Sequence, residues 1–239
     1  MKYLITSSLL DSYDWLKSCP KNWKAKAYED FVSVIRRYKQ TPSEACLRGI
    51  EFEKLICERC NSLDEEAYSK YVRAYYENHG VKGYEVDMAM YTTCNIANQC
   101  RGGGQQVPVK KDIIIGREEY HLFGYADVVF PDEKIIDIKT TGKYKGGYSY
   151  VKRSQHYIYS LCTGINTFKY LIADYKESKI PRDLHQVEFE MTQDENLWVL
   201  EKRIEGLMNY IKNEGLFDDY CNIYSAQRDD EKLKNEVLQ

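Results

Sequence analysis

Apolar residues recur at helical spacing through the first third of the chain. Leu9, Leu10, Tyr13 and Leu16 follow Ser7-Ser8, which predicts a capped helix that ends near Cys19-Pro20. The same spacing predicts further helices over Tyr28–Tyr38, about Ser43–Cys60, and Leu63–Asn78. The stretch Val81–Gln106 has no clear period and contains the glycine run Gly102–Gly104.

From Val107 the pattern changes to short runs rich in β-branched and aromatic residues, which indicates strands. The predicted strands are Val107–Ile115, Tyr120–Phe130, Ile135–Thr140, Thr167–Tyr175 and His185–Met191. A helix is expected over Tyr150–Thr163. The capping box from Thr192 to Glu195 opens a long amphipathic helix that Gly215 ends.

The second and third of these strands form a hairpin around the turn Pro131–Lys134. In the third strand Asp137 and Lys139 share one face, while Ile136 and Ile138 point into a core. The hairpin brings Asp127 beside them. Two carboxylates and an ammonium on one concave face suit a hard cation and a base or charge stabiliser. The alternative is a solvated strand face.

Composition bounds the possible partners. The chain has 239 residues, 43% of them hydrophobic, which predicts one globular domain, and its net charge of −3 excludes a uniformly basic nucleic-acid binder. Yet the segment Ile138–Ala173 contains no Asp or Glu. Its positive charge, set beside a carboxylate cluster, is the arrangement that a polyanion needs. The residues expected to contact nucleic acid are Lys143, Lys145, Lys152 and Arg153. The interleaved Tyr144, Tyr148 and Tyr150 either stack on bases or serve the fold.

Three sequence elements follow one another in a familiar order: Gly-Tyr-Ala-Asp ending at Asp127, Asp-Ile-Lys-Thr starting at Asp137, and Gln155-x-x-x-Tyr159. Together they resemble the PD-(D/E)XK nuclease superfamily, in its RecB-like and lambda-exonuclease-like branch. The resemblance covers most of the chain apart from residues 61–104. It implies an α/β fold with a restriction-endonuclease-like core, a central mixed sheet flanked by helices, and additional helices at both ends.

The resemblance also implies a catalytic set. Gly49 and Glu53 match an early helix of the family that carries a Gly and, four residues later, His or Glu. Glu51 is the nearest competitor, but it lies roughly 200° around the helix from Glu53. Mg²⁺ or Mn²⁺ would be held by Glu53, Asp127, Asp137 and the carbonyl of Ile138. Lys139 would orient or deprotonate water or stabilise charge, and Gln155 and Tyr159 would position Lys139 or the phosphate.

The function so implied is that of a metal-dependent deoxyribonuclease, an exonuclease in DNA recombination, repair or processing. The alternatives are a noncatalytic DNA-binding or complex-forming module with the same fold, and a nuclease that acts with a helicase or an annealing protein. We expect one domain over residues 1–225, with a possible insertion at 61–104, and a charged, flexible tail over 226–239. No apolar run suits a membrane span, so a cytoplasmic location without membrane contact is expected.

The eight cysteines are expected to be mostly reduced thiols. Some RecB-like relatives bind a 4Fe–4S cluster through one early and three late cysteines. Here Cys19 fits the first position but only Cys221 lies near the end, so we predict no such cluster. Two close pairs, Cys57 with Cys60 and Cys94 with Cys100, leave open a four-thiolate zinc or iron–sulfur site. Buried free thiols are the alternative.

Overall fold

The computed structural model describes residues 2–39 and 41–226 of the chain. These residues contain one six-stranded mixed sheet, with the strand order β1-β3-β4-β5-β6 and with β2 also paired to β3. The strands are β1 (Lys2–Thr6), β2 (Gly104–Ile115), β3 (Glu118–Phe130), β4 (Lys134–Thr141), β5 (Thr167–Asp174) and β6 (Asp183–Glu190).

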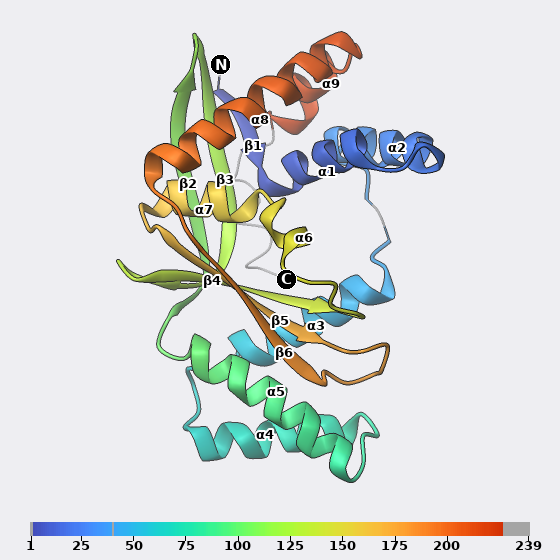
Figure 1. Cartoon of the computed structure of the whole chain (residues 1–239), viewed down its shortest axis with the longest axis vertical. Coiled ribbons are helices and arrows are strands. Elements are labelled where there is room, and N and C mark those ends of the chain that lie inside the picture. The colour runs from blue at the N-terminus through green and yellow to red at the C-terminus, as the bar shows by residue number, and fades with distance from the viewer. Residues whose placement is uncertain (1, 40, 227–239) are drawn as a thin grey trace.

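Helices cover both faces of this sheet (Figure 1). The helices in chain order are α1 (Ser7–Ser18), α2 (Lys24–Ile35), α3 (Glu44–Cys57), α4 (Glu65–Asn78), α5 (Tyr84–Cys100), α6 (Tyr148–Val151), α7 (Gln155–Thr163), α8 (Gln193–Asn213) and α9 (Phe217–Asp219). α1, α2, α7 and α8 pack on one side, and α3, α4 and α5 on the other. The predicted α/β class, a central mixed sheet between helical layers, is confirmed. Additional helices also lie toward both ends of the described chain, α1 and α2 after β1, and α8 and α9 after β6.

The long strand β3 has three partners, and this branching shapes the molecule. β2 runs antiparallel along one edge of β3 from Glu118 almost to its end. The other edge is shared: β1 pairs in parallel with residues 119–123, and β4 pairs antiparallel with residues 128–130. Between these two stretches lies Gly124–Asp127, where β1 and β4 diverge. The branch therefore opens the middle of the sheet at a fixed place.

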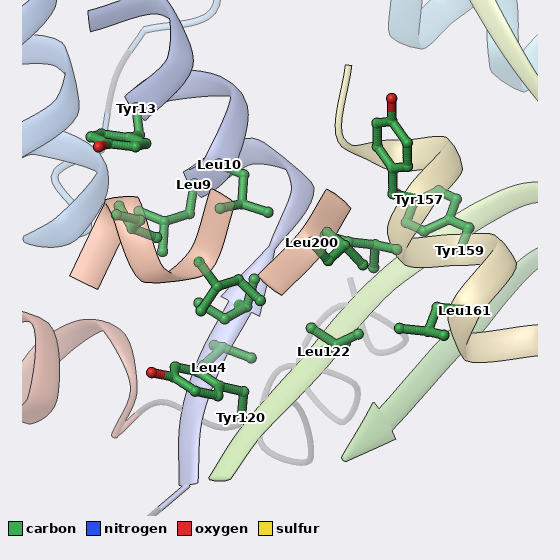
Figure 2. Close-up of a cluster of buried hydrophobic side chains, with 14 of the residues drawn as sticks. Leu4, Leu9, Leu10, Tyr13, Tyr120, Leu122, Tyr157, Tyr159, Leu161 and Leu200 are labelled. Atoms are coloured by element: carbon green, nitrogen blue, oxygen red, sulfur yellow. The ribbon is translucent and has the colours of Figure 1, made fainter. Parts of the chain in front are cut away.

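The core on the α7 and α8 side joins the two ends of the chain (Figure 2). Leu4 of β1, Leu9 and Leu10 of α1 and Leu200 of α8 are buried, with Leu122 of β3 between them. Burying such a side chain contributes about 1.5–3 kcal/mol each. This packing fixes α1 against the sheet branch. The strand β1 was not among the predicted elements, because its five residues precede the first clear period.

The core on the opposite face contains the helix that the sequence did not reveal. Val81–Gln106 showed no period, yet α5 spans 17 residues there. Thr92 and Thr93 of this helix are fully buried. Because its buried face contains these polar residues, the helix does not show a continuous apolar stripe in the sequence. The Thr93 hydroxyl donates to the Ala89 carbonyl at 2.7 Å and pairs with the Tyr76 hydroxyl at 2.8 Å, so its hydrogen bonds are satisfied although it is buried. Residues 61–104 thus supply α4 and α5; that they form an insertion stays a prediction.

Two predicted helices have different bounds. The helix expected over Tyr28–Tyr38 is α2, which begins at Lys24 and ends at Ile35. The helix expected over Tyr150–Thr163 is broken into α6 and α7. At the break, the Ser154 amide donates to Asp11 Oδ1 of α1 at 2.7 Å, a tertiary contact that no local pattern reveals.

Two expectations concern the ends and the exterior of the molecule. In the described ranges 2–39 and 41–226, no helix has both the length and the apolar character needed to cross a membrane. The predicted tail over residues 226–239 lies outside the described residues, apart from Ala226.

Candidate active site

Asp127 and Asp137 meet where β4 leaves β3. The register pairs Val128 with Ile136, so Asp127 and Asp137 are the next two residues across the hairpin. Asp127 Oδ2 accepts a hydrogen bond from the Ile138 amide at 2.7 Å. This contact replaces a strand ladder beyond Val128. As predicted, Ile136 and Ile138 face the apolar core on the α3 side.

Asp137 is fully buried and is held on both oxygens. Gln155, the first residue of α7, donates from Nε2 to Asp137 Oδ1 at 2.9 Å. Lys139 Nζ contacts Asp137 Oδ2 in an ion pair. The resemblance implied that Gln155 positions Lys139 or the phosphate; in this structure Gln155 bonds to the carboxylate of Asp137, which is the ion-pair partner of Lys139. The geometry makes Gln155 a residue that orients Asp137.

Glu53 reaches the same region from α3. Its Oε1 accepts a hydrogen bond from Gln106 Nε2 of β2, and its charge acts on both Asp137 and Lys139. Gly49, one helical turn earlier, lies against β4: a Cβ at this position would be 3.2 Å from Thr140 Oγ1. The small residue therefore lets α3 approach the strand that carries Asp137 and Lys139. This accounts physically for the Gly49–Glu53 spacing.

The charges in this cluster are unbalanced. Burial raises the pKa of Asp127 well above its usual range, and the nearby Asp137 raises it further. Burial likewise raises the pKa of Asp137 and of Glu53, while Lys139 opposes both shifts. Burial alone would lower the pKa of Lys139, but the Asp137 and Asp127 carboxylates outweigh it, so the pKa is raised. Three carboxyl groups face one ammonium, a surplus of negative charge that a cation would offset.

The donor set fits a hard divalent cation. It offers carboxylate oxygens, and Asp137 Oδ2 is a buried atom without a regular hydrogen bond. Across the described ranges of the chain, however, no three His, Cys, Asp or Glu side chains are already arranged to hold a metal ion. Asp137 Oδ2 faces Lys139, and Asp127 Oδ2 faces the Ile138 amide. Cation binding would therefore require these oxygens to exchange their present partners.

Tyr159 closes the gap in the sheet branch. Its ring lies over Gly124, where a Cβ would be only 2.5 Å from Tyr159 Cε1. Glycine in the Gly-Tyr-Ala-Asp sequence is thus needed for this close approach. The Tyr159 hydroxyl shares hydrogen bonds with Gln155 and Ser7, and burial, with help from Asp137, raises its pKa to about 12. Tyr159 is a neutral donor beside the carboxylates at ordinary pH.

The predicted nucleic-acid contacts divide into two kinds. Lys143, Lys145 and Arg153 line a hollow of about 750 Å³ that begins at Thr140, next to Lys139. Arg153 Nη1 is also 3.7 Å from Asp11 Oδ2. Lys152 lies outside the lining of this hollow, with its Nζ 4.6 Å from the centre of the Tyr148 ring. The structure therefore brings Lys143, Lys145 and Arg153 together and leaves Lys152 apart.

Sequence reasoning missed the residues that support this site from other elements. Asp11 holds the Ser154 amide and Arg153, and so sets the start of α7, where Gln155 lies. Gln106, with a φ of 49°, holds Glu53. The only sequence signal for Gln106 is its position beside the glycine run; Asp11 reads as an ordinary acid on a helix surface.

The cysteines have separate partners. All eight are free thiols. Cys60 Sγ accepts from Gln105 Nε2 at 2.8 Å, and Cys94 Sγ lies 3.9 Å from Ser69 Oγ. Burial raises the pKa of Cys57 and Cys100 thiols, as expected of inert packed side chains. Within the described residues, the four candidate ligands Cys57, Cys60, Cys94 and Cys100 do not form a cluster able to hold a metal.

His156 neighbours Gln155 in sequence but points away from the carboxylates. Its ring stacks on Phe189 with centroids 4.3 Å apart, and burial lowers its pKa to about 3. A neutral, packed imidazole belongs to the core between α7 and β6.

In comparisons with known proteins, no family model and no curated protein matches the chain. Among solved structures, the alkaline exonuclease LHK-Exo from Laribacter hongkongensis is similar, with 15% identity and a TM-score of 0.46 over 88% of each chain. LHK-Exo in complex with dAMP gives 15% identity and a TM-score of 0.45.

A protein from Eubacterium rectale, provisionally described as an exonuclease, gives 15% identity and a TM-score of 0.48 over 89% of this chain and 82% of that one. At these identities and TM-scores the similarity assigns no role to this chain. The function of this chain must therefore be inferred from the residues of its own site.

Proposed function

We propose that this protein is a divalent-metal-dependent DNA nuclease that hydrolyses phosphodiester bonds. The observation that carries the proposal is the state of Asp137: a fully buried carboxylate held between Gln155 and Lys139 and next to Asp127. A buried ionisable group with a raised pKa and specific charged partners is typical of a functional site. Its position beside an acid-free, basic segment points to an anionic substrate.

Each residue has a distinct task in this proposal. Glu53, Asp127, Asp137 and the carbonyl of Ile138 would hold Mg²⁺ or Mn²⁺, which supplies charge neutralisation and water activation when bound. Lys139 donates to the phosphate oxygens or orients the attacking water, since its raised pKa keeps it protonated before the cation binds. Gln155 fixes the orientation of Asp137, and Tyr159 keeps Gln155 in place.

The finer assignments rest on the resemblance to RecB-like and lambda-exonuclease-like nucleases. They are DNA as substrate, exonucleolytic attack, and a role in recombination, repair or processing. A helicase or annealing protein as partner follows from the same resemblance.

A noncatalytic DNA-binding or complex-forming module is the second candidate. One observation favours it: no three acidic side chains in the described part of the chain stand ready to bind a metal. In that case Asp137 and Lys139 would form a purely structural ion pair. The two candidates differ in whether added cation gives cleavage.

The test is product analysis on end-labelled linear DNA and on closed circular DNA, with Mg²⁺ or Mn²⁺ added to metal-free protein. An exonuclease degrades the linear DNA to mononucleotides or short products and leaves closed circles intact. Nicking or linearisation of circles would overturn the exonucleolytic assignment and leave a nuclease.

Lys139→Ala is the decisive variant, and Lys70→Ala on α4, which removes an exposed lysine paired with Glu66, is its matched control. The first should be inactive and the second should cleave like the wild-type protein. If wild-type protein and Lys139→Ala are equally inert on every substrate with either metal, the catalytic proposal fails and the noncatalytic module stands.

A further inference from the structure

The loop between β4 and α6 has an ordered structure that neither the sheet nor the catalytic cluster requires. We infer that residues 142–147, here called the lysine arm, form a rigid subsite for the phosphates of the DNA strand next to the cleaved bond. We further infer that Asp174 and His185 act as positioning residues for this arm. The inference rests on the proposed function and adds residues that the sequence analysis did not connect with it.

Exposure alternates along the lysine arm. Lys143 and Lys145 are exposed, whereas Tyr144 between them is half-buried. Tyr144 is thus turned toward the protein, while the lysines on either side of it are turned toward solvent. Both lysines line the 750 Å³ hollow together with Arg153, whose charge also acts on Asp137. The hollow is therefore electrostatically continuous with the catalytic cluster.

Asp174 fixes the backbone of the arm. This carboxylate, at the end of β5, is only 4% exposed. Its Oδ2 accepts from the Tyr144 amide at 3.2 Å, and its Oδ1 accepts from the Lys176 amide at 2.9 Å. Glu177 completes the base of the arm by donating its amide to the Gly142 carbonyl at 2.7 Å. One buried carboxylate thus ties the lysine arm to the turn after β5.

His185 and Val187 of β6 fix the side of the arm that faces the sheet. The Tyr144 ring stacks on His185 at a centroid distance of 4.0 Å and an interplanar angle of 12°. His185 Nε2 in turn lies 3.4 Å from Asp174 Oδ2. Gly147 packs against Val187, where an added Cβ would be 3.2 Å from the Val187 side chain. These contacts hold the arm in place before any ligand arrives, which lowers the entropy cost of binding.

The charges on the arm are available to a ligand. Lys169, in the same acid-free segment, pairs with Glu188 at 2.9 Å, and Arg153 lies 3.7 Å from Asp11. Among the ion pairs of the described residues, neither Lys143 nor Lys145 takes part. Among the described residues that line the hollow, Glu177 is the one acid, whereas Lys143, Lys145 and Arg153 are cations. The balance favours a phosphate backbone.

The experiment measures binding of fluorescein-labelled single-stranded and duplex DNA by anisotropy, in Ca²⁺ and in EDTA, over a range of salt concentrations. The double variant K143Q/K145Q should weaken binding at least about tenfold at low salt. It should also lower the magnitude of the slope of log affinity against log salt by about 1.4–1.8, since each lost phosphate contact removes about 0.7–0.9. K70Q on α4 is the matched control. Because both arm lysines are exposed, these changes should leave the fold intact.

The positioning role is tested by variants that keep both lysines. Tyr144→Phe retains the stack on His185 and should bind like the wild-type protein, whereas Tyr144→Ala should bind several-fold more weakly. His185→Phe should likewise be tolerated better than His185→Leu, because a planar ring preserves the stack. In cleavage assays the weakened variants should raise KM and leave kcat nearly unchanged.

The possible failures are distinguishable. Unchanged affinity and salt slope in K143Q/K145Q would overturn the subsite, even in an active nuclease. Equal affinities for Tyr144→Phe and Tyr144→Ala would overturn the positioning role. If the wild-type protein cleaves nothing but binding still depends on the arm as described, the nuclease proposal fails, and the lysine arm remains a binding site for DNA phosphates without a cleaved bond beside it.

Discussion

Two regions of this molecule each carry four candidate metal ligands, and the structure treats them differently. In one region Glu53, Asp127, Asp137 and the Ile138 backbone lie where β4 leaves β3. In the other lie Cys57 at the end of α3, Cys60 just after it, and Cys94 and Cys100 of α5, where Cys60 and Cys94 bond to separate polar neighbours. The carboxylates act on one another's pKa and share the ammonium of Lys139. The thiols Cys57, Cys60 and Cys100 also act on one another's pKa, but burial is the largest cause of their raised pKa values, and they pack as small apolar groups. The types of the candidate ligands and their spacing in the sequence did not by themselves distinguish the carboxylate region from the cysteine region.

The difference follows from the elements that carry the residues. Asp127 and Asp137 lie on paired strands at the point where the ladder ends, so their side chains must meet. Cys57, by contrast, lies at the end of α3, where Asp127, Glu53 and Cys60 all act on its pKa, and no strand pairing fixes the four thiols relative to one another. Candidate ligands form a preorganised site where backbone pairing holds them close together at an opening in the sheet. The loss of conformational entropy needed to bring the ligands together then occurs on folding and not on binding.

The strongest test of this contrast is Asp137→Asn. The change removes one negative charge but keeps an acceptor for Gln155, so the protein should fold. We expect cleavage to fall by about 10³-fold or more, because both cation binding and the partner of Lys139 are lost. Single-turnover cleavage with Mn²⁺ measures it, with thermal melting as the control for folding. Cleavage within a few-fold of the wild-type rate would show that the carboxylate cluster is structural.

A smaller effect is expected for Gln155→Ala. This variant frees Asp137 Oδ1 without altering any charge, and changes of this kind typically cost about 10–100-fold in metal affinity or activity. Cleavage should therefore be measured as a function of Mn²⁺ concentration. Partial recovery at high Mn²⁺ is expected if Gln155 only orients the ligand; full activity at low Mn²⁺ would remove Gln155 from the site.

The cysteine region should respond in stability and not in metal content. Cys100 is fully buried, so Cys100→Ser places a hydroxyl among apolar groups and should cost about 1–3 kcal/mol of unfolding free energy. Urea denaturation measures this, and Cys46→Ser, at an exposed thiol, is the control. Elemental analysis of the wild-type protein and of Cys100→Ser tests the opposite hypothesis. Stoichiometric zinc or iron in the wild-type protein that is lost in the variant would show that this region is a metal site.

The smallest effect concerns His156, the neighbour of Gln155 that faces the core. Its pKa falls to about 3 in the folded protein, against 6.5 for an unperturbed His. As the pH falls, the unfolded chain therefore binds the His156 proton before the folded protein does. The contribution of neutral His156 to the free energy of unfolding is fully present above pH 6.5 and is lost as the pH falls toward 3. Between pH 7.5 and 5.5 the loss should be about 1 kcal/mol.

His156→Phe should remove this loss and leave cleavage unchanged. Unfolding free energies at the two pH values measure it. An unchanged pH dependence in the variant would mean that another group is responsible.

Much of the fold was accessible from local pattern. The hairpin, the strand β5, the helix α8 with its capping box and the inward direction of Ile136 and Ile138 were all predicted. The predictions failed where tertiary contacts override local signals. α5 was missed because its buried Thr92 and Thr93 are polar, and the break before α7 depends on Asp11, far away in the chain.

The sequence by itself determined which side chains share a strand face or a helix face, because those relations depend only on the two-residue and 3.6-residue periods of the backbone. These periods place Asp137 beside Lys139 on one strand face and Gln155 beside Tyr159 on one helix face, and the predicted hairpin adds Asp127. The resemblance to RecB-like nucleases, and not the periods, supplied Glu53 and the roles expected of all six residues. Only the tertiary structure decided that Gln155 holds Asp137, that Gly124 makes room for Tyr159, and that Asp174 and His185 anchor the lysine arm. Those contacts join residues on different elements, and packing and strand register set their distances.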